Sequence, residues 1–503
     1  MNRTALPAPS PELQQVLDWL TSPGADDPLL DLLPLRNHVV TINALERPAL
    51  HRLKIAELLQ FRAEQIDDTL HPLLLDAKLP LPEHLAKIAQ GLIDLRAELG
   101  STWLAIARDI DPAELQRVHR NSLQICLRGL DNFSRQLVAS LLVASPAPAG
   151  LWRNTQALYH QAIEGVDPTA TYPAEMALIE VRLKAMLALA AAQPEGLTPR
   201  ELAFLASYLV DHAVALQMSP LAPTTTENWL WIETSEDQPP VTLARRTPAS
   251  GQPLFFHCQD LADLAGKELA QLAEGATPSS LGLPIQAAGS DYRNALERAR
   301  QCWMAPRKRS YNRKKKVAGT ENVEVCIHLG SLWEALCGTT HEKPASEKTD
   351  VTMSGWGLLN EGPAGYALMH ISGAVEGIVP GCAIGIRTGA NAAWQICLVR
   401  WARNESREHI ALGIEVMAPH AQAIRIQPDG HRQQSPVAAL LLPPLPAINR
   451  GEAILAARGE YNLRPFTLLH ERDGRLQIVE CTPGRSIAET SSVEIFEFQR
   501  QST

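Results

Sequence analysis

The chain has 503 residues, a length that corresponds to about three domains. Hydrophobic residues make up 45% of it, enough for real hydrophobic cores, and the formal net charge at pH 7 is -9. The acidic balance argues against a protein whose whole surface binds nucleic acid or membrane, so an anionic partner must be bound locally.

The cysteines and the N-terminus favour a reduced, cytoplasmic protein. Eight cysteines are scattered without a CxxC pair, which favours buried thiols over disulfides or a structural zinc site. The first residues lack the basic and apolar regions of a signal peptide, and no apolar stretch approaches the roughly 18 residues of a membrane span. We therefore expect a cytoplasmic location, no metal and no membrane span.

Residues 1–217 are predicted to form an α-helical domain of seven or eight helices. Asp111-Pro112 and Thr198-Pro199 each place a capping residue and a proline before an apolar helical pattern, with a glutamate three residues after the cap. No fixed-period repeat indicates a solenoid. The domain carries no motif that identifies its partner, which we expect to be a protein.

The rest of the chain changes from mixed to β-type patterning. Residues 218–304 are interpreted as a mixed linker region with one strand and two helical stretches. From about residue 320, short alternating runs separated by Gly, Pro and Asn favour antiparallel strands. We expect a β-barrel over 305–425, and over 426–503 either its extension or a second small β-domain. The predicted fold class is therefore multidomain α+β.

A strongly basic segment precedes the predicted barrel. Residues 307–316 carry seven positive charges, and Ser310, Tyr311 and Asn312 are the uncharged members. Blocks of like charge are often solvated linkers, but arginine also offers a planar fork of donors that matches phosphate oxygens and the O6/N7 edge of guanine. The basic segment is therefore either a linker or an anion-binding arm.

This arrangement resembles the PilZ domains, in which an RxxxR motif precedes a small β-barrel that carries a (D/N)xSxxG motif. Arg309 to Arg313 fits the first motif. Two segments fit the second motif: Asp350–Gly355 reads DxTxxG and Asn360–Gly365 reads NxGxxG. Asn360–Gly365 is favoured because the strands that follow it, with V-R-W and G-I-E-V at their ends, keep the order of the PilZ barrel. The resemblance covers about residues 305–425.

The resemblance implies a bacterial regulatory protein that binds cyclic di-GMP and relays the signal by conformational change to a protein partner. Arg309 and Arg313 are expected to bind its phosphates or guanines, and Asn360 to bind a guanine edge. Gly365 is expected to permit a backbone conformation or a close approach that a side chain would forbid. Gly362 stands where the family has serine, so one hydroxyl hydrogen bond, worth about 0.5–1.5 kcal/mol, is absent.

Three tryptophans lie near these motifs. Trp394 and Trp401 are seven positions apart on one predicted strand, which places them on opposite faces, one in the core and one at the surface or toward a ligand. For all three, including Trp356, packing is expected more often than a ligand contact.

Two other functions remain open. A degenerate PilZ-like scaffold would bind proteins alone. The absence of the family's serine at Gly362 favours this function. A nucleic-acid binder would use the basic segment, but the acidic remainder and the lack of interleaved aromatic residues oppose it. Nothing in the sequence supports catalysis, since it holds neither HExxH nor GxSxG.

Overall fold

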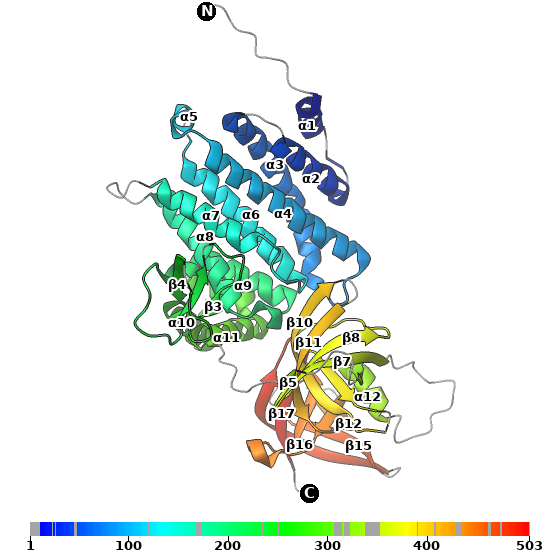
Figure 1. The fold of residues 1–503 in the computed structure, drawn as a ribbon. Coiled ribbons are helices and arrows are strands. Elements are labelled where there is room, and N and C mark those ends of the chain that lie inside the picture. The colour runs from blue at the N-terminus through cyan, green and yellow to red at the C-terminus, as the bar shows by residue number, and fades with distance from the viewer. Residues whose placement is uncertain are drawn as a thin grey trace, which may run out of the picture.

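In the computed structural model the chain forms a helical body followed by two β-barrels (Figure 1). The predicted multidomain α+β fold is therefore confirmed. The helical body makes up the N-terminal end of the molecule and the barrels the C-terminal end. The structure describes residues 11–501 apart from 23, 26, 45–47, 119, 167–172, 234, 250, 306–313, 316–321, 338–352, 390, 407–408, 429–434, 461–463 and 473–474.

Helices α1–α9 form the N-terminal domain. Both predicted helix starts are confirmed, because the Asp111 side chain accepts a hydrogen bond from the amide of Ala113, and Thr198 and Glu201 form a reciprocal capping box. The described residues form nine helices rather than seven or eight, since the short α5 offers less than two turns of periodic pattern. The helices are α1 (Pro11–Thr21), α2 (Pro28–Ala44), α3 (Ala49–Leu70), α4 (Glu83–Asp109), α5 (Pro112–Arg117), α6 (Ser122–Leu142), α7 (Leu151–Glu164), α8 (Ala174–Ala191) and α9 (Pro199–His212). Across the described part of the chain, every helix is too short or too polar to span a bilayer.

Residues 218–304, expected to be a linker region, pack as part of this helical body. Phe256 and Trp303 belong to the same hydrophobic core as the N-terminal helices, and Nε1 of Trp303 donates a 2.9 Å hydrogen bond to the carbonyl of Ala188. A linker would not share that core. The segment holds a small sheet in the order β1-β4-β2-β3 and two helices: β1 (Gln217–Ser219), β2 (Leu230–Glu233), β3 (Val241–Thr242), β4 (Pro253–His257), α10 (Gln259–Ala273) and α11 (Ser290–Met304).

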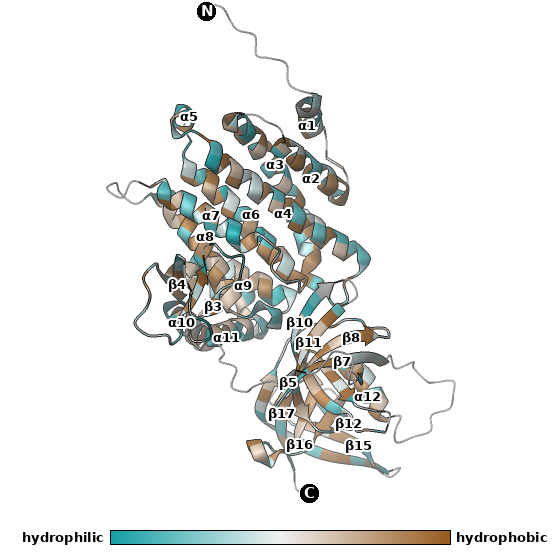
Figure 2. Cartoon of the chain, viewed as in Figure 1, coloured by the Kyte–Doolittle hydropathy of each residue, from teal (hydrophilic) through white to brown (hydrophobic). Residues whose placement is uncertain are grey.

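The first barrel closes through six antiparallel strands in the order β6-β7-β8-β11-β10-β9, with the short β5 paired to β7 beside β6. Its interior is apolar and includes Val325, Leu368, Ile384 and Leu412. Hydropathy varies along the ribbons of both barrels, as expected when alternate residues face inward (Figure 2). The elements are β5 (Lys314–Lys315), β6 (Asn322–Ile327), α12 (Leu329–Cys337), β7 (Met353–Gly362), β8 (Gly365–Ser372), β9 (Ala383–Arg387), β10 (Gln395–Ser406) and β11 (His409–Ala418).

A second closed barrel follows after residues 419–421 and is not an extension of the first. If the six closing strands of each barrel are numbered in chain order, both barrels have the cyclic order 1-2-3-6-5-4. The division between them falls before residue 422 rather than after 425. The strands are β12 (Gln422–Pro428), β13 (Val437–Leu442), β14 (Ala453–Ala457), β15 (Phe466–Arg472), β16 (Arg475–Glu489) and β17 (Val493–Arg500).

The two barrels share an apolar interface. Ile396 and Leu398 on the outside of β10 lie in one buried cluster with Leu440, Leu455 and Ile495 on the outside of the second barrel. This interface holds the barrels against each other through the burial of apolar surface.

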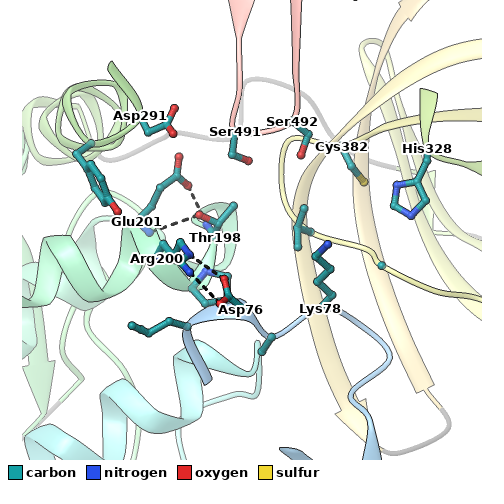
Figure 3. A pocket seen from close by; sticks show the side chains of 16 residues that line it. Asp76, Lys78, Thr198, Arg200, Glu201, Asp291, His328, Cys382, Ser491 and Ser492 are labelled. Atoms are coloured by element: carbon teal, nitrogen blue, oxygen red, sulfur yellow. Dashed lines mark hydrogen bonds and ion pairs between the residues drawn. The ribbon is translucent and has the colours of Figure 1, made fainter. Parts of the chain in front are cut away.

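Both barrels also contact the helical body. Leu79, which precedes α4, forms a two-way backbone bridge with Ile378 of the first barrel, with N–O distances of 3.0 and 2.9 Å. Arg458 of the second barrel contacts Ser290 and Asp291 at the start of α11. Figure 3 shows the junction, where the helical body and both barrels line a cavity of about 340 Å³.

The first barrel closes at the hairpin between β7 and β8. Gly362 pairs with Gly365 at its end, and Gly365 pairs in turn with Glu415 of β11. A Cβ atom at Gly365 would overlap the carbonyl oxygen of Ile414. Glycine is therefore required here by the close approach of a neighbouring backbone, as the motif suggested.

We expect Gly365→Ala to lower the free energy of unfolding by about 1–3 kcal/mol, because β8 must move away from β11. Gly389→Ala is the control, since a Cβ there meets nothing within 4 Å. Urea denaturation of the full chain measures both. Equal stability of the two variants would contradict the close approach.

A titratable group links α9 to α10. Nε2 of His212 lies 3.2 Å from Oε1 of Glu268, whose other oxygen accepts a 2.8 Å hydrogen bond from Tyr208. Burial alone lowers the pKa of His212, but the hydrogen bonds to Glu268 and to the carbonyl of Tyr208 outweigh it and leave that pKa above its ordinary value.

This pKa makes stability depend on pH. Because the folded pKa exceeds the unfolded value of about 6.5, His212 stabilises the fold fully below that pH and loses this effect as pH rises through the folded pKa. We expect His212→Gln to remove this part of the pH dependence, measured by urea denaturation between about pH 5.5 and 8.5. The exposed His84→Gln variant should keep the wild-type slope, and an unchanged slope in His212→Gln would contradict the assignment.

Candidate functional site

Three of the five predicted site residues lie at one end of β7. Asn360 and Gly362 lie on β7 and Gly365 begins β8, whereas Arg309 and Arg313 lie outside the described residues. The strand that directly follows Arg313 is β5, and its Lys315 pairs with Asn360. The basic segment therefore reaches the barrel beside Asn360.

Asn360 faces outward because of a β-bulge. The register of β7 against β8 shifts between Leu358 and Asn360, so that Leu358 pairs with Leu368 and Asn360 pairs with Ala367. Leu358 and Leu368 point into the barrel core. Asn360 and Ala367 therefore share the outer surface, since paired residues point to the same side of a sheet.

The outer surface beside Asn360 is a row of paired residues across four strands. Asn360 of β7 pairs with Ala367 of β8, which pairs with Gly413 of β11, which pairs with Trp401 of β10. At about 4.8 Å per strand, the row spans roughly 14 Å. We call the surface formed by these residues and Gly365 the Asn360–Trp401 face.

Trp401 lies flat over the middle of this face. A Cβ atom at Gly413 would overlap the indole of Trp401, so the ring covers the Gly413 backbone. Ala367 beside it is 1% exposed. The Asn360–Trp401 face therefore has the Trp401 ring over Gly413 and the Asn360 amide at the far end of the row.

The placement of the tryptophans corrects one prediction. Trp394 and Trp401 do not lie on opposite faces, because a bulge between Val399 and Trp401 shifts the alternation by one residue. Trp394 is buried in the cluster between the barrels, as expected for packing. Trp356 is fully buried in the core of the first barrel, and its Nε1 donates to Oγ of Ser354 at 2.9 Å.

Charged groups border the Asn360–Trp401 face on β10. Nε of Arg400 lies 2.6 Å from Oε2 of Glu415, and both side chains are about two-fifths exposed. The guanidinium of Arg403 lies 5.9 Å from the centre of the Trp401 ring. Sequence reasoning did not single out Arg403 and left open which of Trp394 and Trp401 faces outward, because the bulge that turns Trp401 outward leaves no signal in the residue pattern.

The alternative motif lies elsewhere on the same strand. Asp350 is outside the described residues, and Ser354 and Gly355 are on the part of β7 that pairs with β6. Ser354 is buried. Six residues of extended strand, about 20 Å, separate Ser354 from Asn360. The structure brings the end of the basic segment to Asn360–Gly365 and not to Ser354–Gly355.

The thiols and potential metal ligands form no second site in the described ranges. No group of three or more His, Cys, Asp or Glu side chains there is placed to hold a metal ion. Burial raises the pKa of Cys326 to about 12 and that of Cys382 to about 11, so both thiols stay protonated.

Comparisons with known proteins match two parts of the chain. Residues 14–224 match the family model described as the N-terminal domain of the cyclic-di-GMP receptor FimW. Residues 334–423 match the model described as the middle PilZ domain of that receptor. The second match contains Asn360, Gly362 and Gly365 and begins after the basic segment.

One curated protein is similar to part of this chain. It is the cyclic-di-GMP receptor FimW from Pseudomonas aeruginosa, 30% identical over 146 residues, which are 28% of this chain. The match spans 23% of the length of that relative. No solved structure is significantly similar to the chain. The PilZ match, the closed barrel and the order of its strands agree with the resemblance seen in the sequence. Residues 334–423 are therefore identified as a PilZ domain, and this domain lies in the first of the two barrels.

Proposed function

We propose that this chain is a receptor, not an enzyme, that binds cyclic di-GMP on the Asn360–Trp401 face and relays binding through the helical body to a protein partner. The observation that carries the proposal is the pairing of Lys315 with Asn360, which delivers the basic segment to the edge of this face. The similarity to proteins named as cyclic-di-GMP receptors supports the same ligand.

The chemistry of the ligand fits the residues of this face and the basic segment. Cyclic di-GMP carries two phosphates and two guanines. Arg309 and Arg313 supply planar donor pairs for phosphate oxygens or for the O6/N7 edge of guanine. The amide of Asn360 both donates and accepts at a guanine edge, and the indole of Trp401 offers a ring on which a base stacks. Gly365 allows β8 to approach β11 closely at the edge of this face.

Binding also neutralises the charge of the basic segment. Its seven positive charges repel one another until an anion neutralises them. The ligand therefore draws the segment onto the Asn360–Trp401 face, next to the place where β5 already pairs with β7. This is the conformational change that the helical body passes on.

A second candidate function is a PilZ scaffold that binds proteins alone. The observation that favours it is Gly362, which supplies no hydroxyl where the family has serine. The missing hydrogen bond weakens a nucleotide complex by about tenfold or less, which is compatible with a receptor.

Isothermal titration calorimetry of the full chain with cyclic di-GMP tests the proposal. We expect binding that Arg309→Ala/Arg313→Ala reduces more than about 100-fold, since charged hydrogen bonds contribute about 1.5–3 kcal/mol each. Asn360→Ala should weaken binding about 3- to 10-fold.

The matched control is Asn391→Ala, an exposed asparagine in the loop before β10, which should bind like the wild type. Cyclic di-AMP is the control ligand, because adenine lacks the O6 acceptor that the arginines recognise. Absence of heat with the wild-type chain at high micromolar cyclic di-GMP would reject the receptor and favour the protein-binding scaffold.

A further inference from the structure

The helical body touches the first barrel on the same strand that carries Trp401. The amide of Asn404 donates a 2.8 Å hydrogen bond to the carbonyl of Ala144, which follows α6. A Cβ atom at Gly196 would lie 3.0 Å from the carbonyl oxygen of Arg400. Gly196 ends the short 3-10 turn Pro194–Gly196, so this turn rests against the bulged part of β10.

The turn also holds a charged contact. Oε1 of Glu195 lies 3.6 Å from Nη2 of Arg403, and the two side chains are 40% and 41% exposed. Arg403 pairs with Ala411 of β11 on the outer side of the sheet, and its guanidinium stands beside the Trp401 ring. The Arg403 guanidinium thus contacts both the Trp401 ring at the border of the Asn360–Trp401 face and the Glu195 carboxylate of the helical body.

This ion pair is weak and open to exchange. An exposed pair of this kind contributes about 0–1 kcal/mol, because water screens both charges and two long side chains must be held. A phosphate diester bears a full negative charge and accepts two parallel hydrogen bonds from a guanidinium, which a single carboxylate oxygen at 3.6 Å does not match. A phosphate on this face would therefore take Arg403 from Glu195.

We propose that Arg403 is a phosphate-binding residue of the nucleotide site and that Glu195 of the helical body competes with the ligand for it. This inference rests on the proposed receptor function and adds a mechanism by which ligand binding at that site is regulated. Ligand binding releases Glu195 and leaves it next to a like charge, which weakens the contact of the Pro194–Gly196 turn with β10. By reciprocity, a partner that draws this turn away from β10 raises the affinity for the nucleotide by the same factor.

Other contacts of the first barrel limit how far it can respond when the Pro194–Gly196 turn loosens from β10. The Leu79–Ile378 backbone bridge and the hydrogen bond from Thr490 to the carbonyl of Gly381 involve neither Glu195 nor Arg403. They keep the first barrel attached while the turn at Glu195 responds. The ligand therefore alters one contact of the helical body rather than releasing the whole barrel.

Calorimetry on the full chain separates the roles of the two residues. We expect Arg403→Ala to weaken cyclic di-GMP binding about 10-fold, and Glu195→Gln to tighten it up to about 5-fold, because the competitor is removed. In the Arg403→Ala background, Glu195→Gln should have no further effect. The matched control is Glu452→Gln, which breaks a similarly exposed pair with Arg500 on the second barrel and should leave affinity unchanged.

Hydrogen exchange gives a readout that does not depend on affinity. Saturating cyclic di-GMP should speed exchange of the amides of residues 195–197 in the wild type but not in Glu195→Gln, in which the competing charge is absent already. Failure of the wild type to bind rejects the receptor itself. Wild-type binding with additive effects of Arg403→Ala and Glu195→Gln overturns this inference and leaves the receptor intact.

Discussion

The close approach of β8 to β11 at Gly365 is the constraint on which the first barrel and its outer face depend. The barrel closes only if β8 can reach β11, and a side chain at residue 365 would meet the Ile414 carbonyl. Two pairs further along β11, Gly413 must also lack a side chain, because the Trp401 indole lies on its backbone. The closure of the first barrel and the flatness of its outer surface therefore have the same cause. At Gly365 and Gly413 the backbone packs against its neighbours without a side chain of its own.

Much of the fold follows from local signals that the sequence contains. Asp111 and Thr198 start helices because their side chains satisfy free amides in the first turn, an effect that needs no tertiary context. The glycine at 365 was likewise recognisable, since a motif and a predicted hairpin coincide there. The strands of the first barrel were visible as alternating runs because one side of each faces an apolar interior.

Other features depend on contacts between distant segments and leave no such signal. The bulges before Asn360 and Trp401 reverse which residues face outward, so strict alternation placed Trp401 on the wrong side of the sheet relative to Trp394. The pairing of Glu195 with Arg403 joins two domains. Residues 218–304 looked like a linker because their strands are short, yet Trp303 completes a core built by helices that precede it.

The stacking of the two barrels decides which of their corresponding outer surfaces is covered. In the first barrel the outer surface of strands 2, 3 and 6, together with Trp401 of strand 5, is the Asn360–Trp401 face. The corresponding surface of the second barrel, with Leu440, Leu455 and Ile495, is buried under β10 of the first. Two barrels of like topology thus meet head to tail through unlike surfaces, as in a heterologous subunit contact. Such a stack leaves a different surface uncovered at each end, so in the described part of the chain the Asn360–Trp401 face has no exposed counterpart on the second barrel, which packs against the first.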